Sequence, residues 1–306
     1  MPGIAYLGPE GTFTEAALRA IDEHGLIPGP AGRVEPIATD SAGAALSAVR
    51  SGAAAYACVP IENSIDGSVS PTLDGLADGS PLQIFAELTL DVAFTIAVRP
   101  GVAAAQVRTV AAFPVAAAQV KRWLAAELPN AVLVPAHSNA AAATDVAAGK
   151  ADAAVSTALA TVRYGLDALA AGIVDEPNAR TRFVLVGAPA APPKRTGADR
   201  TSVVLRLDNV PGALVSAMTE LSMRDIDLTR IESRPTRTEL GTYFFFLDFV
   251  GHVDDEPVAE ALRALHRRCA DVRYLGSWPT GEPAGMTPPA MDEAADWLER
   301  LRKGTS

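Results

Sequence analysis

The chain has few of the residues that most often carry enzyme chemistry. It contains two cysteines and four histidines, and aromatic residues make up only 6% of its 306 residues. Cys58 and Cys269 lie far apart, and the histidines show no spacing typical of a metal site, so we expect no metal centre. The sequence also lacks Gly-x-Ser-x-Gly, Walker-type and Gly-x-Gly-x-x-Gly motifs. Any chemistry must therefore use hydroxyls, amides and backbone dipoles.

Positive charge is scarce as well. The chain has 26 Lys and Arg against 36 Asp and Glu, a formal net charge of −10 at pH 7, which argues against general binding to nucleic acid or anionic membranes. No apolar stretch reaches the ~18 residues that a membrane span needs. The N-terminus shows no charged leader or signal-type apolar block, so we expect a cytoplasmic protein. An anionic ligand would need a locally positive pocket inside this acidic protein.

Short β-like runs alternate with longer Ala-rich helical runs over the first 187 residues. Such alternation predicts βαβ units and mostly parallel sheets. The expected strands are 4–7, 56–61, 91–98, 107–113, 131–135, 151–155 and 181–187. The expected helices begin just after residue 11 and span about 41–51, 71–78, 114–127, 138–149 and 156–171.

A proline-rich segment, 188–200, is typical of a linker. Beyond it the pattern changes to the order βαββαβ, which is the ferredoxin-like split unit. The expected elements are strands 201–209, 228–235, 242–250 and 272–278, with helices 212–224 and 256–268. A unit of about 75 residues should gain stability by pairing with another copy. The tail, 279–306, is expected to hold a short amphipathic helix at 292–302.

Polar residues gather where the expected strands lead into helices. The joints are Thr12 with Glu15 in a capping-box pattern, Ser70 before Pro71, Ser138 with Asn139, and Ser156. Each joint presents unpaired N–H groups and the positive end of a helix dipole. One such cap alone is usually structural, but several that converge would form an anion site without many lysines.

Two further segments place polar residues at the end or the start of an expected strand. Residues 60–67 would deliver Glu62, Asn63 and Ser64 to the carboxyl end of a buried strand, although Asp66-Gly67 also fits a plain turn. The expected strand 181–187 begins with Thr181-Arg182-Phe183. In isolation, these three residues are also typical of an ordinary strand edge.

Together these segments resemble the prephenate dehydratase family, in its monofunctional actinobacterial form. The resemblance is carried, in order, by Gly8–Phe13, Pro60–Ser64, Asn178 with Thr181–Phe183, and then Gly212–Val215 and Glu232–Pro235, which are similar to two motifs of the ACT regulatory domain. It extends from residue 3 to about 278. It implies an α/β catalytic domain at 1–187, two-lobed and periplasmic-binding-protein-like, and an ACT domain at 201–278. Lobe 1 would be about 1–76 and 177–187, and lobe 2 about 77–176.

The implied reaction is that of a carbon–oxygen lyase and needs no cofactor. Prephenate loses its ring carboxylate as CO2 and its C4 hydroxyl as water, which gives phenylpyruvate for phenylalanine biosynthesis. By this resemblance Thr181 is the catalytic residue, donating a hydrogen bond to the departing oxygen. The implied substrate-binding residues are Thr12, Asn63, Ser64, Gln119, Arg182 and Phe183. Arg182 either pairs with a substrate carboxylate or braces the cleft through Glu62 or Asp175.

The resemblance also implies an allosteric site for L-phenylalanine. Its expected residues are Asn209, Gly212, Ala213, Leu214, Val215, Glu232, Ser233 and Arg234. A glycine at 212 allows close approach of the ligand, and the helix N-terminus there favours its carboxylate. Residues 232–235 would complete the pocket from a neighbouring copy or an adjacent strand.

The expected assembly is a homodimer or a homotetramer built as a dimer of dimers, with no nucleic-acid or membrane partner. Two alternatives stay open: an arogenate (cyclohexadienyl) dehydratase, and a non-enzymatic amino-acid sensor with the same cleft.

Overall fold

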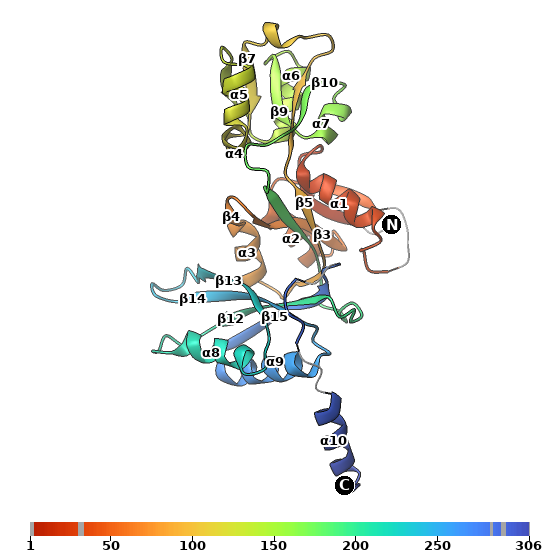
Figure 1. Cartoon of the computed structure of the whole chain (residues 1–306), viewed down its shortest axis with the longest axis vertical. Helices are drawn as coiled ribbons and strands as arrows, with labels where there is room; N and C mark the ends of the chain where they lie inside the picture. The colour runs from red at the N-terminus through yellow and green to blue at the C-terminus, as the bar shows by residue number, and fades with distance from the viewer. Residues whose placement is uncertain (1–2, 30–33, 282–283, 289–291, 306) are drawn as a thin grey trace. The chain divides into compact units, whose positions relative to one another are not determined.

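The computed structural model describes residues 3–29, 34–281, 284–288 and 292–305 (Figure 1). The other residues belong to the expected first domain and tail and lie outside the described residues. The chain forms two compact units. One contains Met1–Thr72 and Leu88–Val184, and the other contains Leu73–Glu87 and Leu185–Ser306. None of the helices in the described ranges is long and apolar enough to cross a membrane.

The first sheet has six strands, in the order β2-β1-β3-β11-β5 with β4 paired to β3. They are β1 (Gly3–Leu7), β2 (Glu35–Thr39), β3 (Tyr56–Asn63), β4 (Gly67–Ser68), β5 (Gln83–Asp91) and β11 (Arg180–Gly187). Its helices are α1 (Phe13–Glu23), α2 (Ala42–Arg50) and α3 (Ser70–Ala77). β1 pairs in parallel with β2 and β3, so the segments that follow these three strands leave the same edge of the sheet.

The second sheet has five strands, in the order β10-β6-β9-β7-β8. They are β6 (Phe94–Val98), β7 (Thr109–Ala112), β8 (Val132–Pro135), β9 (Ala153–Ser156) and β10 (Asp167–Ile173). Its helices are α4 (Pro114–Gln119), α5 (Lys121–Glu127), α6 (Asn139–Ala147) and α7 (Ala158–Arg163), with a 3-10 turn at Ala104–Gln106. β7 is parallel to β8 and β9, whereas β6 is antiparallel to β9 and β10. Buried alanines of α6 and β9 share one core, where short side chains let helix and sheet approach closely.

The expected helix at 156–171 is wrong in its second half. α7 begins after its N-cap Thr157 rather than at Ser156, and it ends at Arg163. Gly165 then adopts a φ of 63°, and Asp167–Ile173 pairs with β6 as a strand. The alanines of this stretch favour a helix, but pairing with an available sheet edge outweighs that preference. The expected helix 114–127 is likewise divided at Val120, and β2 and most of β5 had no clear pattern in the sequence.

The passage between the two sheets also differs from the expected position. The first crossing was expected near residue 77, but Gln83–Asp91 still belongs to the first sheet. The chain enters the second sheet with β6 and returns to the first with β11. The domain and lobe boundaries given above stay predictions.

The third sheet carries the βαββαβ order that the sequence predicts. Its elements are β12 (Asp199–Arg206), α8 (Ala213–Ser222), β13 (Leu228–Pro235), β14 (Tyr243–Val250), α9 (Glu256–Arg268) and β15 (Asp271–Pro279). The strands are antiparallel neighbours in the order β13-β14-β12-β15. Both helices cover one face of this sheet (Figure 1). Helix α10 (Asp292–Arg302) lies in the tail at the expected position.

The segment Leu73–Glu87 packs with the third sheet. Arg234 on β13 makes two hydrogen bonds with the Asp74 carboxylate, at 3.0 and 3.2 Å. Trp278 on β15 donates from Nε1 to Glu87 at 3.1 Å. α3 and the start of β5 are therefore held by the same sheet that carries the expected effector motif Glu232–Pro235.

The proline-rich segment 188–200 is attached to its surroundings. The Ala190 N–H donates to the Gln83 side chain at 3.2 Å. The carbonyl of Pro193 lies 2.9 Å from Nε2 of His252, a fully buried residue. Because Nδ1 of that ring accepts from the Asp254 N–H, Nε2 carries the proton and donates it to Pro193. The linker is thus fixed by side chains at both of these points.

Candidate active site

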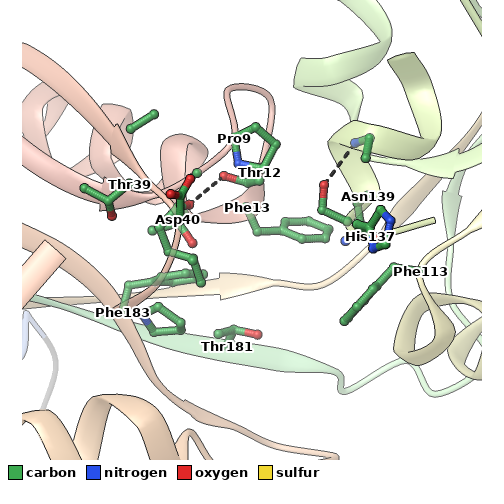
Figure 2. Close-up of a pocket in the computed structure, with 17 residues that line it drawn as sticks. Pro9, Thr12, Phe13, Thr39, Asp40, Phe113, His137, Asn139, Thr181 and Phe183 are labelled. Atoms are coloured by element: carbon green, nitrogen blue, oxygen red, sulfur yellow. Dashed lines mark hydrogen bonds between the residues drawn. The ribbon is translucent and has the colours of Figure 1, made fainter. Parts of the chain in front are cut away.

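A pocket of about 640 Å³ lies where segments from the first and second sheets meet (Figure 2). The segments that follow β1, β2, β7 and β8 line it, together with the beginning of β11. Ligands of α/β folds collect at such carboxyl ends of strands. The volume is within the range of about 300–1,000 Å³ that is usual for small-molecule sites.

Helices α1 and α6 begin at this pocket. Thr12 caps α1, accepting from the Glu15 N–H at 3.4 Å, and Ser138 caps α6, accepting from the Ala141 N–H at 3.0 Å. Thr39 and Asp40 line the pocket just before Ser41, the cap of α2. Among the described lining residues there is no lysine or arginine. The positive potential therefore comes from helix N-termini, which suits an anion in an acidic protein.

The cap of α1 differs in one detail from the capping box. In that motif Glu15 should accept from the N–H of Thr12. Instead its carboxylate accepts from the N–H of Gly11, one residue earlier. It also binds Arg19 and Arg163, each at 2.7 Å. The Thr12 hydroxyl donates to the Leu7 carbonyl at 3.2 Å.

Thr181 lies on β11 at the floor of the pocket and forms a pair with Asn63. The Asn63 amide donates from Nδ2 to the Thr181 hydroxyl oxygen at 3.0 Å. The amide oxygen is occupied, because it accepts from the N–H groups of Ile65 at 2.8 Å and Asp66 at 3.0 Å. This network assigns the orientation of the amide. Since Thr181 accepts from Asn63, its own proton remains available for a hydrogen bond into the pocket.

Two expected substrate-binding residues support this pair rather than line the pocket. The Ser64 hydroxyl donates to the Asn178 carbonyl at 3.0 Å and accepts from the Arg180 N–H at 2.8 Å, so it fastens the turn after β3 to the start of β11. Gln119 on α4 is buried and donates to Asp66 at 3.3 Å. Its Oε1 atom has no hydrogen-bond partner among the described residues.

The other two residues of the motif on β11 are buried. Arg182 forms an ion pair with Glu62 at 3.0 Å, which is one of the two bracing contacts that the sequence left open. Asp175, the other candidate, accepts from the Arg122 N–H at 2.7 Å. Phe183 is 1% exposed and lines the pocket through its packing.

Sequence reasoning missed several lining residues. Figure 2 shows Thr39 and Asp40 on the side of Thr12, and Phe113 and His137 on the side of Asn139. These residues lie at the end of a strand or in the segments that lead from strands to helices, where neither periodicity nor a motif marks them. The adjacency of His137 to the helix cap Ser138 was the one available signal, because a residue before a cap at a converging joint shares its pocket.

The expected effector residues are divided in the chain. Gly212 caps α8 with a φ of 81°, and a pocket of about 210 Å³ beside it is lined by Ala213, Pro211 and Cys269. Asn209 and Val215 are exposed and Leu214 is half-buried. Glu232, Ser233 and Arg234 lie on β13, which is separated from β12 by β14. A neighbouring copy and the same chain both stay predicted sources of these residues.

Comparisons with known proteins agree with one another. The sequence model of the prephenate dehydratase family matches residues 4–191, and that of the ACT domain matches residues 201–267. A prephenate dehydratase of Mycolicibacterium vanbaalenii is 79% identical over 310 residues, covering 99% of either chain. The crystal structure of prephenate dehydratase from Arthrobacter aurescens in complex with L-Phe is 40% identical with a TM-score of 0.87, covering 98% of this chain and 99% of that one.

A prephenate dehydratase structure from Staphylococcus aureus is 22% identical, with a TM-score of 0.74, and covers 90% of this chain and 99% of that chain. At that identity it bears on the fold alone. These likenesses confirm the predicted fold class, a two-lobed periplasmic-binding-protein-like α/β domain followed by a ferredoxin-like ACT domain.

Proposed function

This chain belongs to the prephenate dehydratase family, whose members are lyases, and we propose that it converts prephenate to phenylpyruvate in L-phenylalanine biosynthesis. One observation supports the proposal above others: Thr181, which Asn63 orients, lines a pocket together with the N-termini of α1 and α6. We place the reaction in the cytoplasm, as the sequence predicts, and it uses no cofactor.

The pocket offers separate places for the two ends of a dianion. The carboxylates of prephenate would lie at the N-termini of α1 and α6, where Thr12 and Asn139 add polar atoms. The apolar ring would lie against Phe113 and Phe183. Such an arrangement orients the substrate, which is the main requirement because aromatisation of the ring drives the reaction.

Thr181 acts on the leaving group. As the bond from the ring carbon to the carboxylate breaks, its electrons enter the ring and CO2 departs. The C4 hydroxyl leaves with the electrons of its bond to carbon, and a proton from the solvent converts it to water. The Thr181 hydroxyl donates a hydrogen bond to this oxygen while Asn63 donates to Thr181. A hydroxyl is a weak acid, so its contribution is stabilisation of developing negative charge.

A direct assay tests the activity. Purified protein is incubated with prephenate, and phenylpyruvate is measured by its ultraviolet absorbance in alkali. We expect turnover that requires no added metal or cofactor. Absence of turnover together with tight ligand binding would instead support the non-enzymatic sensor.

Arogenate is a second candidate substrate because Asp40 lines the pocket. Arogenate carries an ammonium group where prephenate has a keto group, and a carboxylate attracts an ammonium ion. The ratio of kcat/KM for the two substrates decides between them. If arogenate binds beside Asp40, Asp40→Asn should lower kcat/KM for arogenate and leave that for prephenate unchanged or raised.

We further propose that L-phenylalanine regulates the enzyme through the ACT domain, in a homodimer or homotetramer. The relative from Arthrobacter aurescens was crystallised with L-Phe, and the Gly212 turn here offers a helix N-terminus to a carboxylate. Inhibition requires that L-phenylalanine binds two states of the enzyme with different affinity. The Arg234–Asp74 contact supplies a place where the effector motif meets α3, the first helix after β3, the strand that ends at Asn63.

A further inference from the structure

The first turn of α1 contains a buried carboxylate. Glu15 lies in the first turn of α1 and is 3% exposed. Its carboxylate is therefore close to the helix N-terminus that lines the pocket with Thr12. An unbalanced carboxylate there would cancel the positive potential of the helix end and repel a dianionic substrate.

Two arginines balance Glu15, and one of them comes from the other sheet. Arg19 follows Glu15 by one turn of the same helix and binds it at 2.7 Å. Arg163 comes from α7, after β9 of the second sheet, and also binds Glu15 at 2.7 Å. The other terminal nitrogen of the Arg163 guanidinium, Nη1, binds the Glu10 carboxylate, just before Gly11 and Thr12. Arg163 thus bridges the two acidic residues that flank Thr12.

One face of α7 contacts the Gly11–Thr12 turn and the acidic residues on either side of it. Thr157 donates from its hydroxyl to the Gly11 carbonyl at 2.6 Å. A methyl group at Gly11 would lie 2.9 Å from the Cβ of Ala160, so the backbones meet closely there. Thr157, Ala160 and Arg163 are spaced by three residues and share one face of the helix.

We propose that Arg163 is a positioning residue for substrate binding, which holds the Gly11–Thr12 turn in place and offsets the charge of Glu15. This inference rests on the proposed function. It assigns to α7, a helix without a residue in the pocket lining, the task of setting the anion-binding end of α1.

The first test compares steady-state kinetics of Arg163→Met and Arg163→Lys. The loss of one positive charge beside the helix end should raise KM for prephenate about tenfold, with a much smaller change in kcat. Arg163→Lys keeps the charge but loses the two-armed contact, so it should recover part of the increase. An unchanged KM in an active Arg163→Met enzyme would overturn the proposal.

A double variant separates charge from geometry. In Arg163→Met/Glu15→Gln both charges are absent, so KM should return toward the wild-type value if the arginine acts by offsetting Glu15. A KM as high as in Arg163→Met alone would show that the arginine acts only by holding the turn. A KM unaffected in all variants contradicts both parts.

The control is Lys150→Met, which changes the net charge by the same amount. Lys150 pairs with Asp145 at 3.1 Å on the exposed surface and does not line the pocket. Its substitution should leave KM unchanged. A KM increase as large as that of Arg163→Met would mean that net charge, and not the position of Arg163, is responsible.

A measurement without substrate distinguishes failure of this inference from failure of the proposed function. The Gly11 N–H donates to Glu15, so its hydrogen exchange reports on the turn. Exchange should become about tenfold faster in Arg163→Met and stay unchanged in Lys150→Met. If the wild-type protein does not convert prephenate but this change is seen, the activity is wrong and the role of Arg163 in the turn stands. Equal exchange in all three proteins refutes that role.

Discussion

The pocket beside Thr181 and the expected effector site of the ACT domain differ in how they are built. Thr181 and Asn63 are 118 residues apart in sequence, yet their side chains are in contact within one chain. The effector motifs Gly212–Val215 and Glu232–Pro235 are far closer in sequence, but β14 separates the strands that carry them.

This difference has a physical origin in the two kinds of sheet. In the first sheet, parallel strands bring several carboxyl ends to one edge, so a single chain completes a pocket. In the antiparallel third sheet, β14 lies between β12 and the edge strand β13, so the two motifs belong to strands that are not neighbours. We therefore predict that a ligand site that needs both motifs uses a second copy, as expected of a regulatory site in an oligomer.

The largest expected effect tests the one-chain pocket. Thr181→Ala removes the hydroxyl that donates to the leaving oxygen, so kcat should fall about 100- to 1,000-fold with little change in thermal unfolding. Thr181→Ser retains a hydroxyl and should keep more activity. Steady-state assays measure both variants. Turnover of Thr181→Ala at the wild-type rate would remove Thr181 from the mechanism.

Asn63→Asp should have the next largest effect, lowering kcat about 10- to 100-fold. A carboxylate at this position would accept the hydrogen bond of the Thr181 hydroxyl, which would then not be available to the leaving oxygen. Co-expression of Asn63→Asp chains with Thr181→Ala chains should not restore activity, because both residues come from one chain. Recovery in the mixed oligomers would show that the pocket is shared between copies.

A mixing experiment tests whether the effector site, unlike the pocket beside Thr181, is formed by two chains. Gly212→Val and Ser233→Ala should each weaken inhibition by L-phenylalanine several-fold and spare basal turnover. If the site lies between two copies, co-expressed chains regain about a quarter of intact sites, since one of the two sites in each mixed dimer is normal. Inhibition curves of the purified mixture measure this. A mixture as unresponsive as either variant would contradict a site shared in this way.

The smallest effect concerns thiol chemistry and not turnover. Burial raises the pKa of Cys269, beside the Gly212 turn, to about 11, and that of the fully buried Cys58 to about 12. Because the thiolate reacts, alkylation of Cys269 should be slow at pH 8 and rise about tenfold per pH unit up to its pKa. L-phenylalanine should slow it about twofold by covering the pocket. Mass spectrometry of labelled peptides follows both cysteines, and equal labelling with and without the amino acid would argue against a ligand there.

The sequence predicts those parts of the fold that depend on local patterns. The cap at Thr12, the βαββαβ order and helix α10 each have a local signal, a motif or a period. β10 does not, because its alanines favour a helix until β6 offers a partner. Local sequence patterns therefore predict helices and strands, except where an unpaired sheet edge favours strand pairing over the local preference.

The candidate site follows the same division. Motifs point to Thr181 and Asn63, but their hydrogen bond depends on the return of β11 beside β3. The link from Arg163 to Glu15 spans 148 residues and has no motif at all. Such contacts arise from topology, which periodicity alone does not determine.

The position of Leu73–Glu87 has a consequence for synthesis of the protein. This segment packs with the third sheet, whose first strand, β12, leaves the ribosome about 110 residues later, or roughly 5 to 20 seconds at usual elongation rates. During that interval α3 and the start of β5 expose surfaces that have no partner yet. The N-terminal half of the nascent chain can therefore complete its packing only after the C-terminal half has been synthesised. Division of the chain at any single position would not give two fragments that each contain a complete unit.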